Sequence, residues 1–182
     1  NFLVPNSIDL SEFQVLAVIL VLSGDATLPN DALIMGMVGR LHTVKNPQYG
    51  VSALIKAQEL DRNVHLVLIG PDEENLEYLL RIQARSANCE DRLHFTGLLS
   101  KNEIKNALAD IDLLLMPSKS ENFGMSAAEA MAAGLPIITS DRVPVGLWAK
   151  EGNAGEITPL DSKLFSTKTV ELLKSSSRFH IM

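Results

Sequence analysis

The stretch ALIMGMVGRLHTVKNPQYGVSALIKAQELDRNVHLVLIG, residues 32–70, decides the fold that we expect for this chain. It opens and closes with an apolar run, at residues 32–39 and 64–70, and each run ends in glycine, a turn former. Runs that are apolar almost throughout are typical of strands buried on both faces of a sheet. The segment 47–60 between them starts with proline, which is tolerated in the first turn of a helix. The stretch therefore predicts two parallel strands joined by a helix.

The same alternation continues toward the C-terminal end. Further strands are expected at residues 92–97, 112–118 and 136–140, and further helices at 73–87, 100–109, 124–133 and 164–174. Ser100 opens one of these helices and Glu103 follows three residues later, which is a capping-box pattern. This alternation predicts an α/β fold, a Rossmann-like doubly wound parallel sheet with helices on both faces. The run VLAVILVL at residues 15–22 fits either a strand or a buried helix, because periodicity alone does not distinguish the two.

The composition is that of an ordinary globular chain and argues against several classes of protein. Its 182 residues, 46% of them hydrophobic, suit one domain with a single core. A net charge of −6 argues against a general nucleic-acid surface, although a local basic pocket could still bind a small anion. No signal peptide is recognisable, and the apolar run at 15–22 is shorter than the roughly 20 residues that span a bilayer. The one cysteine, Cys89, has no partner for an internal disulfide, and no Cys/His cluster has metal-ligand spacing. We therefore expect no metal and a reducing, cytoplasmic setting.

Two basic residues follow the first strand of the decisive stretch. In an open parallel sheet, ligands bind beyond the carboxyl ends of the strands, near the switch in strand order. The loop VGRLHTVKNP, residues 38–47, carries Arg40 and Lys45, and Gly39 allows close approach of the backbone. Arg binds phosphate by its fork geometry and Lys as a point charge, so the two could neutralise a diphosphate. The alternative is two solvated surface charges.

Two acidic residues flank the start of a later helix, in SENFGMSAAEAMAAG, residues 120–134. The amides at a helix start near Gly124 form an anion site, which the helix dipole reinforces. Glu121 precedes that start and Glu129 lies more than a turn beyond it, and carboxylates accept hydrogen bonds from sugar hydroxyls. The pattern suits a ligand that has hydroxyls on either side of a diphosphate. Acids near helix starts are also common for dipole reasons alone.

A third loop, HFTGLLSKNE at residues 94–103, could offer backbone groups of Gly97 and Leu98 to a flat base. An ordinary strand-to-helix turn is the alternative for this loop.

Taken together, these residues resemble the C-terminal domain of glycosyltransferase family 4, whose members have the GT-B fold. VGRL followed by Lys45 is similar to the family's phosphate-binding signature. The pattern ENFGMSAAE is similar to its E-x(7)-E motif, and EAMAAGLPIITSD is close to the usual continuation. FLVPNSIDLSEF, residues 2–13, resembles the end of the family's interdomain linker. The resemblance implies a linker end at residues 1–13 and a nucleotide-sugar-binding domain at 14–175, with a tail at 176–182.

The resemblance also implies a role for each matching position. Arg40 and Lys45 would bind the donor diphosphate and stabilise its charge, and Glu121 would hydrogen-bond the transferred sugar. The further donor-binding positions would be Gly39, Leu98 near the base, Asn122, Phe123, Gly124 and Met125 around the sugar and phosphates, and Glu129 on the ribose hydroxyls.

The family transfers a sugar from a nucleotide-sugar donor, with retention at the anomeric carbon and usually without a metal or other cofactor. This chain would be one half of a GT-B enzyme, inactive alone. An N-terminal domain outside this sequence would bind the acceptor, a saccharide or a lipid-linked glycan. Polysaccharide assembly, a cytoplasmic location and peripheral membrane association of the full-length enzyme are expected by analogy with relatives.

Some positions depart from the family pattern. Ser7 and Asn46 stand where glycine is usual, and DRVPVGLWAKEG at residues 141–152 differs from the glycine-rich loop often found there. Trp148 in that stretch is expected to pack rather than to form a sugar platform.

Other functions are compatible with the same residues. A binding-only nucleotide-sugar module and a nucleotide-sugar epimerase of GT-B architecture would share these residues. A dinucleotide-dependent oxidoreductase would need a G-x-G-x-x-G pattern after the first strand, and MGMVGR lacks that spacing. The sugar, the base, the acceptor and the oligomeric state are not specified by the sequence.

Overall fold

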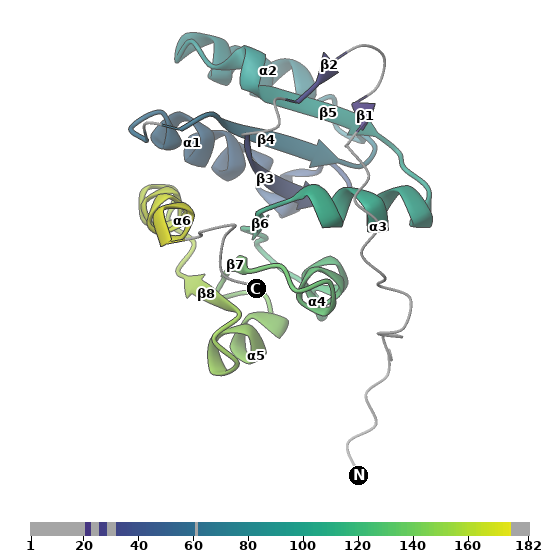
Figure 1. Ribbon diagram of the computed structural model, residues 1–182, viewed down its shortest axis with the longest axis vertical. Coiled ribbons are helices and arrows are strands. Elements are labelled where there is room, and N and C mark those ends of the chain that lie inside the picture. Colours follow the sequence, from purple (N-terminus) through teal and green to yellow (C-terminus); the bar gives the residue numbers. More distant parts are fainter. Residues whose placement is uncertain (1–20, 23–25, 29–31, 61, 176–182) are drawn as a thin grey trace.

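The computed structural model describes residues 21–22, 26–28, 32–60 and 62–175, and a parallel sheet lies at its centre (Figure 1). The strands of this sheet are β3 (Leu33–Val38), β4 (Val64–Ile69), β5 (Leu93–Gly97), β6 (Leu113–Met116), β7 (Ile137–Ser140) and β8 (Gly155–Thr158). The helices are α1 (Pro47–Ala57), α2 (Glu77–Ser86), α3 (Lys101–Asp110), α4 (Met125–Ala132), α5 (Val145–Glu151) and α6 (Ser162–Ser175), with short 3-10 helices η2 (Thr43–Lys45) and η3 (Glu90–Arg92). The six strands lie in the order β5-β4-β3-β6-β7-β8, and each neighbouring pair is parallel.

The elements expected between residues 32 and 140 are all present, and so is the last helix. Their observed bounds differ from the expected ones by at most a few residues. The capping box is confirmed, because the Ser100 hydroxyl accepts from the Glu103 amide and the Glu103 carboxylate accepts from the Ser100 amide. The α/β doubly wound fold is likewise confirmed.

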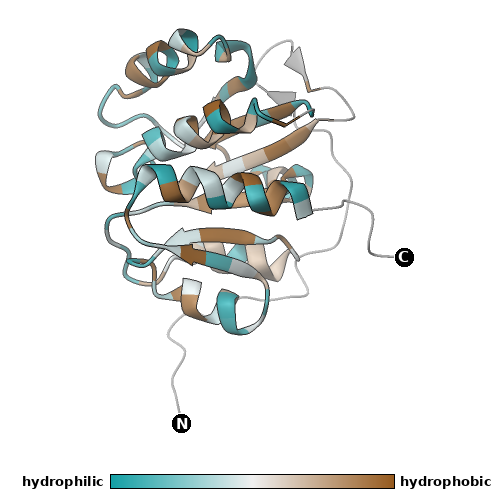
Figure 2. Ribbon diagram, turned by 90° about the vertical axis from the view of Figure 1, so that its left-hand side faces the viewer, coloured by the Kyte–Doolittle hydropathy of each residue, from teal (hydrophilic) through white to brown (hydrophobic). Residues whose placement is uncertain are grey.

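Each face of the sheet has its own hydrophobic core. Successive strand residues point to opposite faces, so Met35 and Leu66 belong to one core and Ile34 and Val67 to the other. The first core is covered by α1, α2 and α6, and the second by α3, α4 and α5. In Figure 2 the central strands are largely brown, the hydrophobic colour, and the helices that cover them carry both hydrophobic and hydrophilic residues.

The order of the strands places a crevice at the middle of the sheet. The chain enters at β3, moves outward through β4 to β5, and then returns to β6 on the other side of β3 before continuing to β8. The loops after β3 and β6 therefore leave neighbouring strands in diverging directions. Such a switch point is where open α/β sheets bind their ligands.

The sequence does not predict α5 and β8, which extend the alternation by one unit. β8 is a half-buried edge strand, GEIT, and so lacks the apolar run that identifies the central strands. Helix α5 packs closely on β7, since a Cβ added to Gly146 would come 2.2 Å from Thr139 Oγ1. The stretch 141–152 is therefore largely a helix rather than a long loop.

Part of the N-terminal apolar run lies in the described region. Its last two residues form β1 (Val21–Leu22), which pairs antiparallel with β2 (Ala26–Thr27). Residues 15–20, the expected linker end at 1–13 and the expected tail at 176–182 fall outside the described residues. Among the helices that the structure describes, none is both long enough and apolar enough to cross a membrane.

A pair of histidines on β4 and β5 is expected to make stability depend on pH. His94 Nε2 lies 2.9 Å from His65 Nδ1, and the two rings stack with centroids 5.1 Å apart. Burial, followed by the neighbouring His65 and Arg81, lowers the pKa of His94 from 6.5 to about 4. The unfolded chain therefore binds more protons than the folded chain between these values, so stability falls as the pH falls from about 6.5 to 4. Because the His94 ring is only partly buried, solvent screens part of this effect, and we expect a loss on the order of 1–2 kcal/mol over this window.

The measurement is urea unfolding of the wild type and of His94→Gln at several pH values between 4 and 7. Carboxylates that titrate in this window affect both proteins. The difference between the two proteins in how the free energy of unfolding changes with pH therefore gives the contribution of His94. Parallel curves for the two proteins would contradict the prediction.

Candidate functional site

The candidate site lies at the carboxyl ends of β3 and β6, where the strand order switches. A pocket at this place is lined by Gly39, Arg40, Lys45 and Ser118, among apolar residues from the central strands. Two segments meet here, the loop from Gly39 to Asn46 and the loop from Pro117 to Gly124. The sequence predicts both loops as functional, and the structure shows them side by side.

The loop after β3 continues the pairing of β3 with β4. The Gly39 amide donates to the Ile69 carbonyl at 2.9 Å, and the Leu41 amide donates to the Pro71 carbonyl at 2.8 Å. Gly39 has a φ of 144°, a conformation that favours glycine. The backbone beside Arg40 is therefore held by the sheet rather than left as a free loop.

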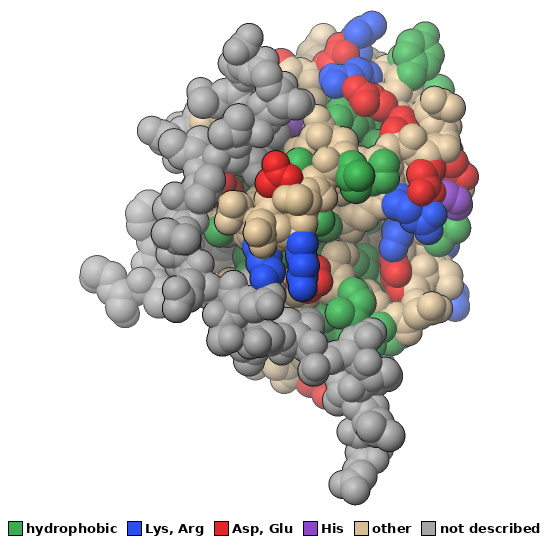
Figure 3. Space-filling view, turned by 90° about the vertical axis from the view of Figure 1, so that its right-hand side faces the viewer, with side chains coloured by type: hydrophobic (Ala, Val, Ile, Leu, Met, Phe, Trp, Pro, Cys, Tyr) green, Lys and Arg blue, Asp and Glu red, His purple; other side chains and the backbone are tan. Residues whose placement is uncertain are grey.

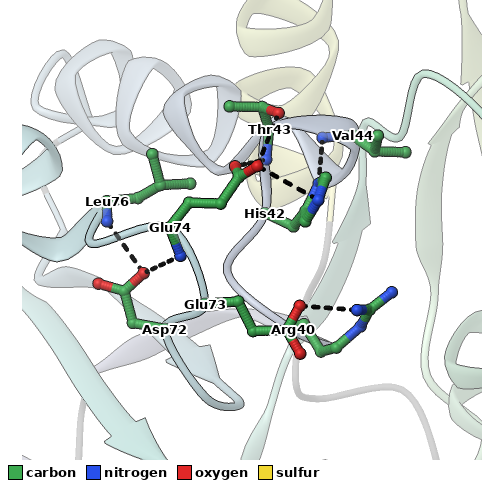
Figure 4. Close-up of polar contacts among 8 residues, drawn as sticks. All are labelled: Arg40, His42, Thr43, Val44, Asp72, Glu73, Glu74 and Leu76. Atoms are coloured by element: carbon green, nitrogen blue, oxygen red, sulfur yellow. Dashed lines mark hydrogen bonds and ion pairs between the residues drawn. The ribbon is translucent and has the colours of Figure 1, made fainter.

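Acidic residues after β4 contact the loop that carries Arg40 (Figure 4). Arg40 Nη1 lies 2.6 Å from Glu73 Oε2, with the two side chains 59% and 39% exposed. Glu74 accepts from the Thr43 amide at 2.6 Å and lies 3.2 Å from His42 Nε2. The loop between β4 and α2 thus holds the loop from Gly39 to Asn46 in place and partly neutralises its positive charge.

Asp72 fixes the shape of that acidic loop. Its carboxylate accepts from the amides of Leu76 and Glu77, each at 2.9 Å, and from the Glu74 amide at 3.3 Å. Although desolvation opposes the effect, these amides hold the pKa of Asp72 below its ordinary value. Asp72 therefore stays ionised and connects the start of α2 to the position of Glu74.

Asn46 joins the two loops of the site. It has a φ of 51°, it is 1% exposed, and its side-chain amide donates to the Pro117 carbonyl at 2.9 Å. The Lys119 amide donates to the Val44 carbonyl at 2.7 Å, close to the same place. Asn tolerates the left-handed conformation better than other residues with a side chain. The departure from glycine at position 46 therefore keeps the backbone shape and adds a hydrogen bond.

Lys45, which lines the pocket, forms an ion pair with Glu121. Lys45 Nζ contacts Glu121 Oε1, and the two side chains are only 27% and 13% exposed. The Ser118 hydroxyl donates to the same oxygen at 2.8 Å. Lys45 also passes over Gly39, since its Cε would lie 3.7 Å from a Cβ added there. A basic and an acidic group from distant parts of the chain are thus held together in a partly buried position.

Helix α4 starts beside the pocket. Gly124 precedes it with a φ of 97°, and a Cβ added there would come 2.8 Å from Val143 and 2.9 Å from Val145. The Ser126 hydroxyl donates to the Val38 carbonyl at 3.0 Å, which attaches the first turn to the end of β3. Glu129 is half-buried and lies three residues after Ser126, so both occupy one face of α4. That face is therefore the one turned toward the end of β3.

The remaining predicted residues lie at different distances from this pocket. Asn122 is exposed, and Phe123 packs edge-on against Trp148 with ring centroids 5.2 Å apart. Met125 is the first residue of α4. Leu98 is 79% exposed and follows the edge strand β5, two strands away from β3. The structure thus brings Arg40, Lys45 and Glu121 to one place and leaves Leu98 at its periphery.

Three residues of the site were not identified from the sequence, namely Ser118, Glu73 and Glu74. Glu73 and Glu74 contact residues that are distant in the sequence, so their role shows only in the folded chain. Ser118 is close to Glu121 in the sequence, but a single serine is not a recognisable binding pattern. Among the described residues, no group of three or more His, Cys, Asp or Glu side chains is placed to hold a metal ion. The face in Figure 3 shows acidic and basic side chains interspersed, which differs from the continuous basic surface of nucleic-acid-binding proteins.

The chain is similar to known glycosyltransferases in sequence and in structure. The family model for glycosyl transferases group 1 matches residues 22–177. A 2-deoxystreptamine glucosyltransferase of Streptomyces kanamyceticus is 30% identical over 126 residues, which cover 69% of this chain and 31% of that protein. A D-inositol 3-phosphate glycosyltransferase of Mycolicibacterium smegmatis is 33% identical over 62% of this chain and 26% of its own. The chain thus spans about a third or less of the length of these relatives.

Solved structures of glycosyltransferases share the fold. WaaG, a glycosyltransferase involved in lipopolysaccharide biosynthesis, superposes with a TM-score of 0.71 at 22% identity, over 80% of this chain and 39% of its own. HepE of Anabaena, in complex with UDP and glucose, superposes with a TM-score of 0.69 at 23% identity, over 79% of this chain and 39% of its own. These likenesses confirm the Rossmann-like, GT-B type of fold expected from the sequence.

Proposed function

Because the chain belongs to the family of glycosyl transferases group 1, we propose that it is the donor-binding domain of a retaining glycosyltransferase of family 4. The observation that carries the proposal is the meeting of Arg40, Lys45 and Glu121 at the switch point of the sheet, beside the start of α4. Cations and a helix start suit phosphates, and a carboxylate suits sugar hydroxyls. Arg40 and Lys45 line the pocket, Glu121 contacts the lining residues Lys45 and Ser118, and the first turn of α4 is hydrogen-bonded to Val38 of the same lining, which suits a nucleoside diphosphate sugar.

In this proposal the diphosphate lies between Arg40, Lys45 and the first amides of α4. Glu121 accepts hydrogen bonds from the transferred sugar, and Glu129 accepts them from the ribose. Residues from Asn122 to Met125 shape the loop around the sugar, Gly39 admits the phosphates, and Leu98 borders the base. The neighbour HepE contains UDP, so uridine nucleotides are the first donors to test.

The donor must displace Glu73 from Arg40 in order to use that guanidinium fully. The pair is largely exposed, and exposed ion pairs contribute only about 0–1 kcal/mol. A diphosphate offers two charged groups and adjacent contacts, so it competes well with one carboxylate. Lys45 differs, because it can stay paired with Glu121 while its charge also faces the phosphates.

Sugar transfer would proceed by breaking the bond between the anomeric carbon and the diphosphate oxygen. Charge then builds on the leaving diphosphate, and Arg40, Lys45 and the α4 start stabilise it as fixed charges and dipoles. Glu121 orients the sugar, and the acceptor hydroxyl oxygen forms its bond to the anomeric carbon on the face from which the diphosphate leaves. The leaving phosphate takes the proton of that hydroxyl, and attack on the same face gives retention. The acceptor, a saccharide or a lipid-linked glycan, would be bound mainly by an N-terminal domain, and closure of the two domains would exclude water.

The same proposal covers the organisation of the chain and its surroundings. Residues 1–13 end an interdomain linker, 14–175 form the donor domain and 176–182 are a tail. The full-length enzyme would act in the cytoplasm, with peripheral contact to the membrane in polysaccharide assembly.

Titration calorimetry with UDP, GDP and ADP tests the donor site. We expect the isolated chain to bind one of them weakly and to transfer no sugar. Arg40→Ala and Glu129→Ala should each weaken that binding by about 1.5–3 kcal/mol, roughly 10- to 100-fold. Arg85→Ala is the matched control, because Arg85 forms an exposed ion pair with Glu90 away from the pocket. Equal affinities in all four proteins would count against the site, and full-length protein without turnover would favour a binding-only module.

A further inference from the structure

We propose that Ser118 is a positioning residue that fixes one oxygen of the Glu121 carboxylate and so leaves the other, Oε2, for the donor sugar. This inference rests on the proposed function, since it assigns the part that one oxygen of the proposed sugar-binding carboxylate plays. It goes beyond that function by naming a residue that determines how tightly the sugar is held.

Ser118 is built into the structure rather than placed on a mobile surface. It is 1% exposed and follows β6 directly after Pro117. Its carbonyl accepts from the hydroxyl of Ser140, which is itself 1% exposed and ends β7. The neighbouring turn is attached to the β3–α1 loop through Asn46 and the Pro117 carbonyl. The Ser118 hydroxyl therefore starts from a backbone whose position is set by three segments.

The hydrogen bonds to Glu121 divide its two oxygens. The Ser118 hydroxyl donates to Oε1 at 2.8 Å, and Lys45 Nζ contacts the same Oε1. Among the residues that the structure describes, no hydrogen bond or ion pair involves Oε2. Two donors on one oxygen use its lone pairs, whereas the second oxygen keeps its full capacity to accept. The carboxylate thus has one protein-bound side and one side for a ligand.

Ser118 also fixes the direction in which Oε2 of Glu121 points. A single contact from the flexible Lys45 side chain would let the carboxylate rotate about its bond to Cγ. A second contact, from a short and buried side chain, removes that freedom before the sugar arrives, so less entropy is lost on binding. Loss of Ser118 should therefore affect the contribution of the sugar and leave binding of the nucleoside diphosphate almost unchanged.

The experiment compares UDP with UDP-glucose and UDP-galactose, and GDP and ADP with their glucose conjugates, on the full-length protein by calorimetry. The quantity of interest is the ratio of the affinity for the nucleotide sugar to the affinity for the matching nucleoside diphosphate. We expect Ser118→Ala to lower this ratio about three- to tenfold and Glu121→Gln to lower it at least as much. The double variant should be no worse than Glu121→Gln alone, because the serine acts through the carboxylate.

The controls separate the outcomes. Ser166→Ala removes another buried hydroxyl, which donates to the Lys163 carbonyl on α6, and should leave the ratio unchanged. If Ser118→Ala does not fold, Ser140→Ala, which releases the Ser118 carbonyl, should still lower the ratio. An unchanged ratio in a folded Ser118→Ala, or effects of Ser118→Ala and Glu121→Gln that simply add, would overturn this inference alone. If no nucleoside diphosphate or nucleotide sugar binds the wild type, the proposed function is overturned and the inference with it.

Discussion

Replacing Lys45 with alanine is expected to lower kcat/KM for sugar transfer by the full-length enzyme roughly 100- to 1,000-fold, as removal of a preorganised charge-stabilising group does elsewhere. The physical reason is double. The change removes a partly buried cation at the proposed site of the leaving diphosphate, and it leaves the Glu121 carboxylate without its counter-charge. A carboxylate that has lost its partner beside a diphosphate repels the charge that develops in the transition state. Initial rates at several donor concentrations measure the effect.

Two further variants show whether the charge itself is responsible. Lys45→Arg keeps the charge but changes its geometry, and should recover part of the lost rate. Lys56→Ala removes a lysine in the last turn of α1 that pairs with Glu59 just after the helix, and should change the rate less than about threefold, because exposed pairs contribute little. A Lys45→Ala enzyme within threefold of the wild type would show that the ion pair with Glu121 serves folding rather than transfer.

The central part of the fold follows from the sequence because its strands are buried on both faces. Residues such as Leu66, Val67 and Leu68 are apolar without interruption, and a short run of this kind that ends in a turn former is typical of a strand between two helical layers. β8 could not be predicted in this way, because an edge strand is less buried and does not need an apolar run. Gly155 and Glu156 can therefore stand in it. The N-terminal run at 15–22 shows the same limit, because apolar residues alone fit a strand or a helix.

The site is partly predictable for a similar reason. Arg40, Lys45 and Glu121 belong to local patterns at strand ends, where chemistry is expected from topology alone. The pairing of Lys45 with Glu121 joins residues 76 apart, and that of Arg40 with Glu73 joins residues 33 apart. Local sequence carries no information on such pairs, since they depend on which strands become neighbours. Whether Leu98 reaches a base stays a prediction, because its position at the edge of the sheet neither requires nor forbids the contact.

Replacing Gly70 with alanine is expected to destabilise the protein by about 3–5 kcal/mol, the range of the severest single substitutions. Gly70 has a φ of 143°, and a Cβ added there would come 2.1 Å from the carbonyl oxygen of Gly39 and 2.6 Å from its carbonyl carbon. Both obstacles are backbone atoms, so no side chain can rotate out of the way. The Gly70 amide also donates to the Gly97 carbonyl at 2.9 Å, which prevents the residue from moving away.

Gly97→Ala is the matched control for this steric argument. Gly97 also has a positive φ, of 67°, but a Cβ added there would meet no atom within 4 Å. Gly97→Ala should therefore lower the free energy of unfolding only by the cost of a positive φ for alanine, about 1–2 kcal/mol. Thermal unfolding should show a fall in Tm of roughly 6–20 °C for Gly70→Ala and only a few degrees for Gly97→Ala. Because the clash is with Gly39, any folded Gly70→Ala protein must displace the backbone next to Arg40, so its affinity for a nucleoside diphosphate should fall as well. Equal losses of stability in the two variants would mean that the strained φ, and not the close approach of the two loops, requires glycine at position 70.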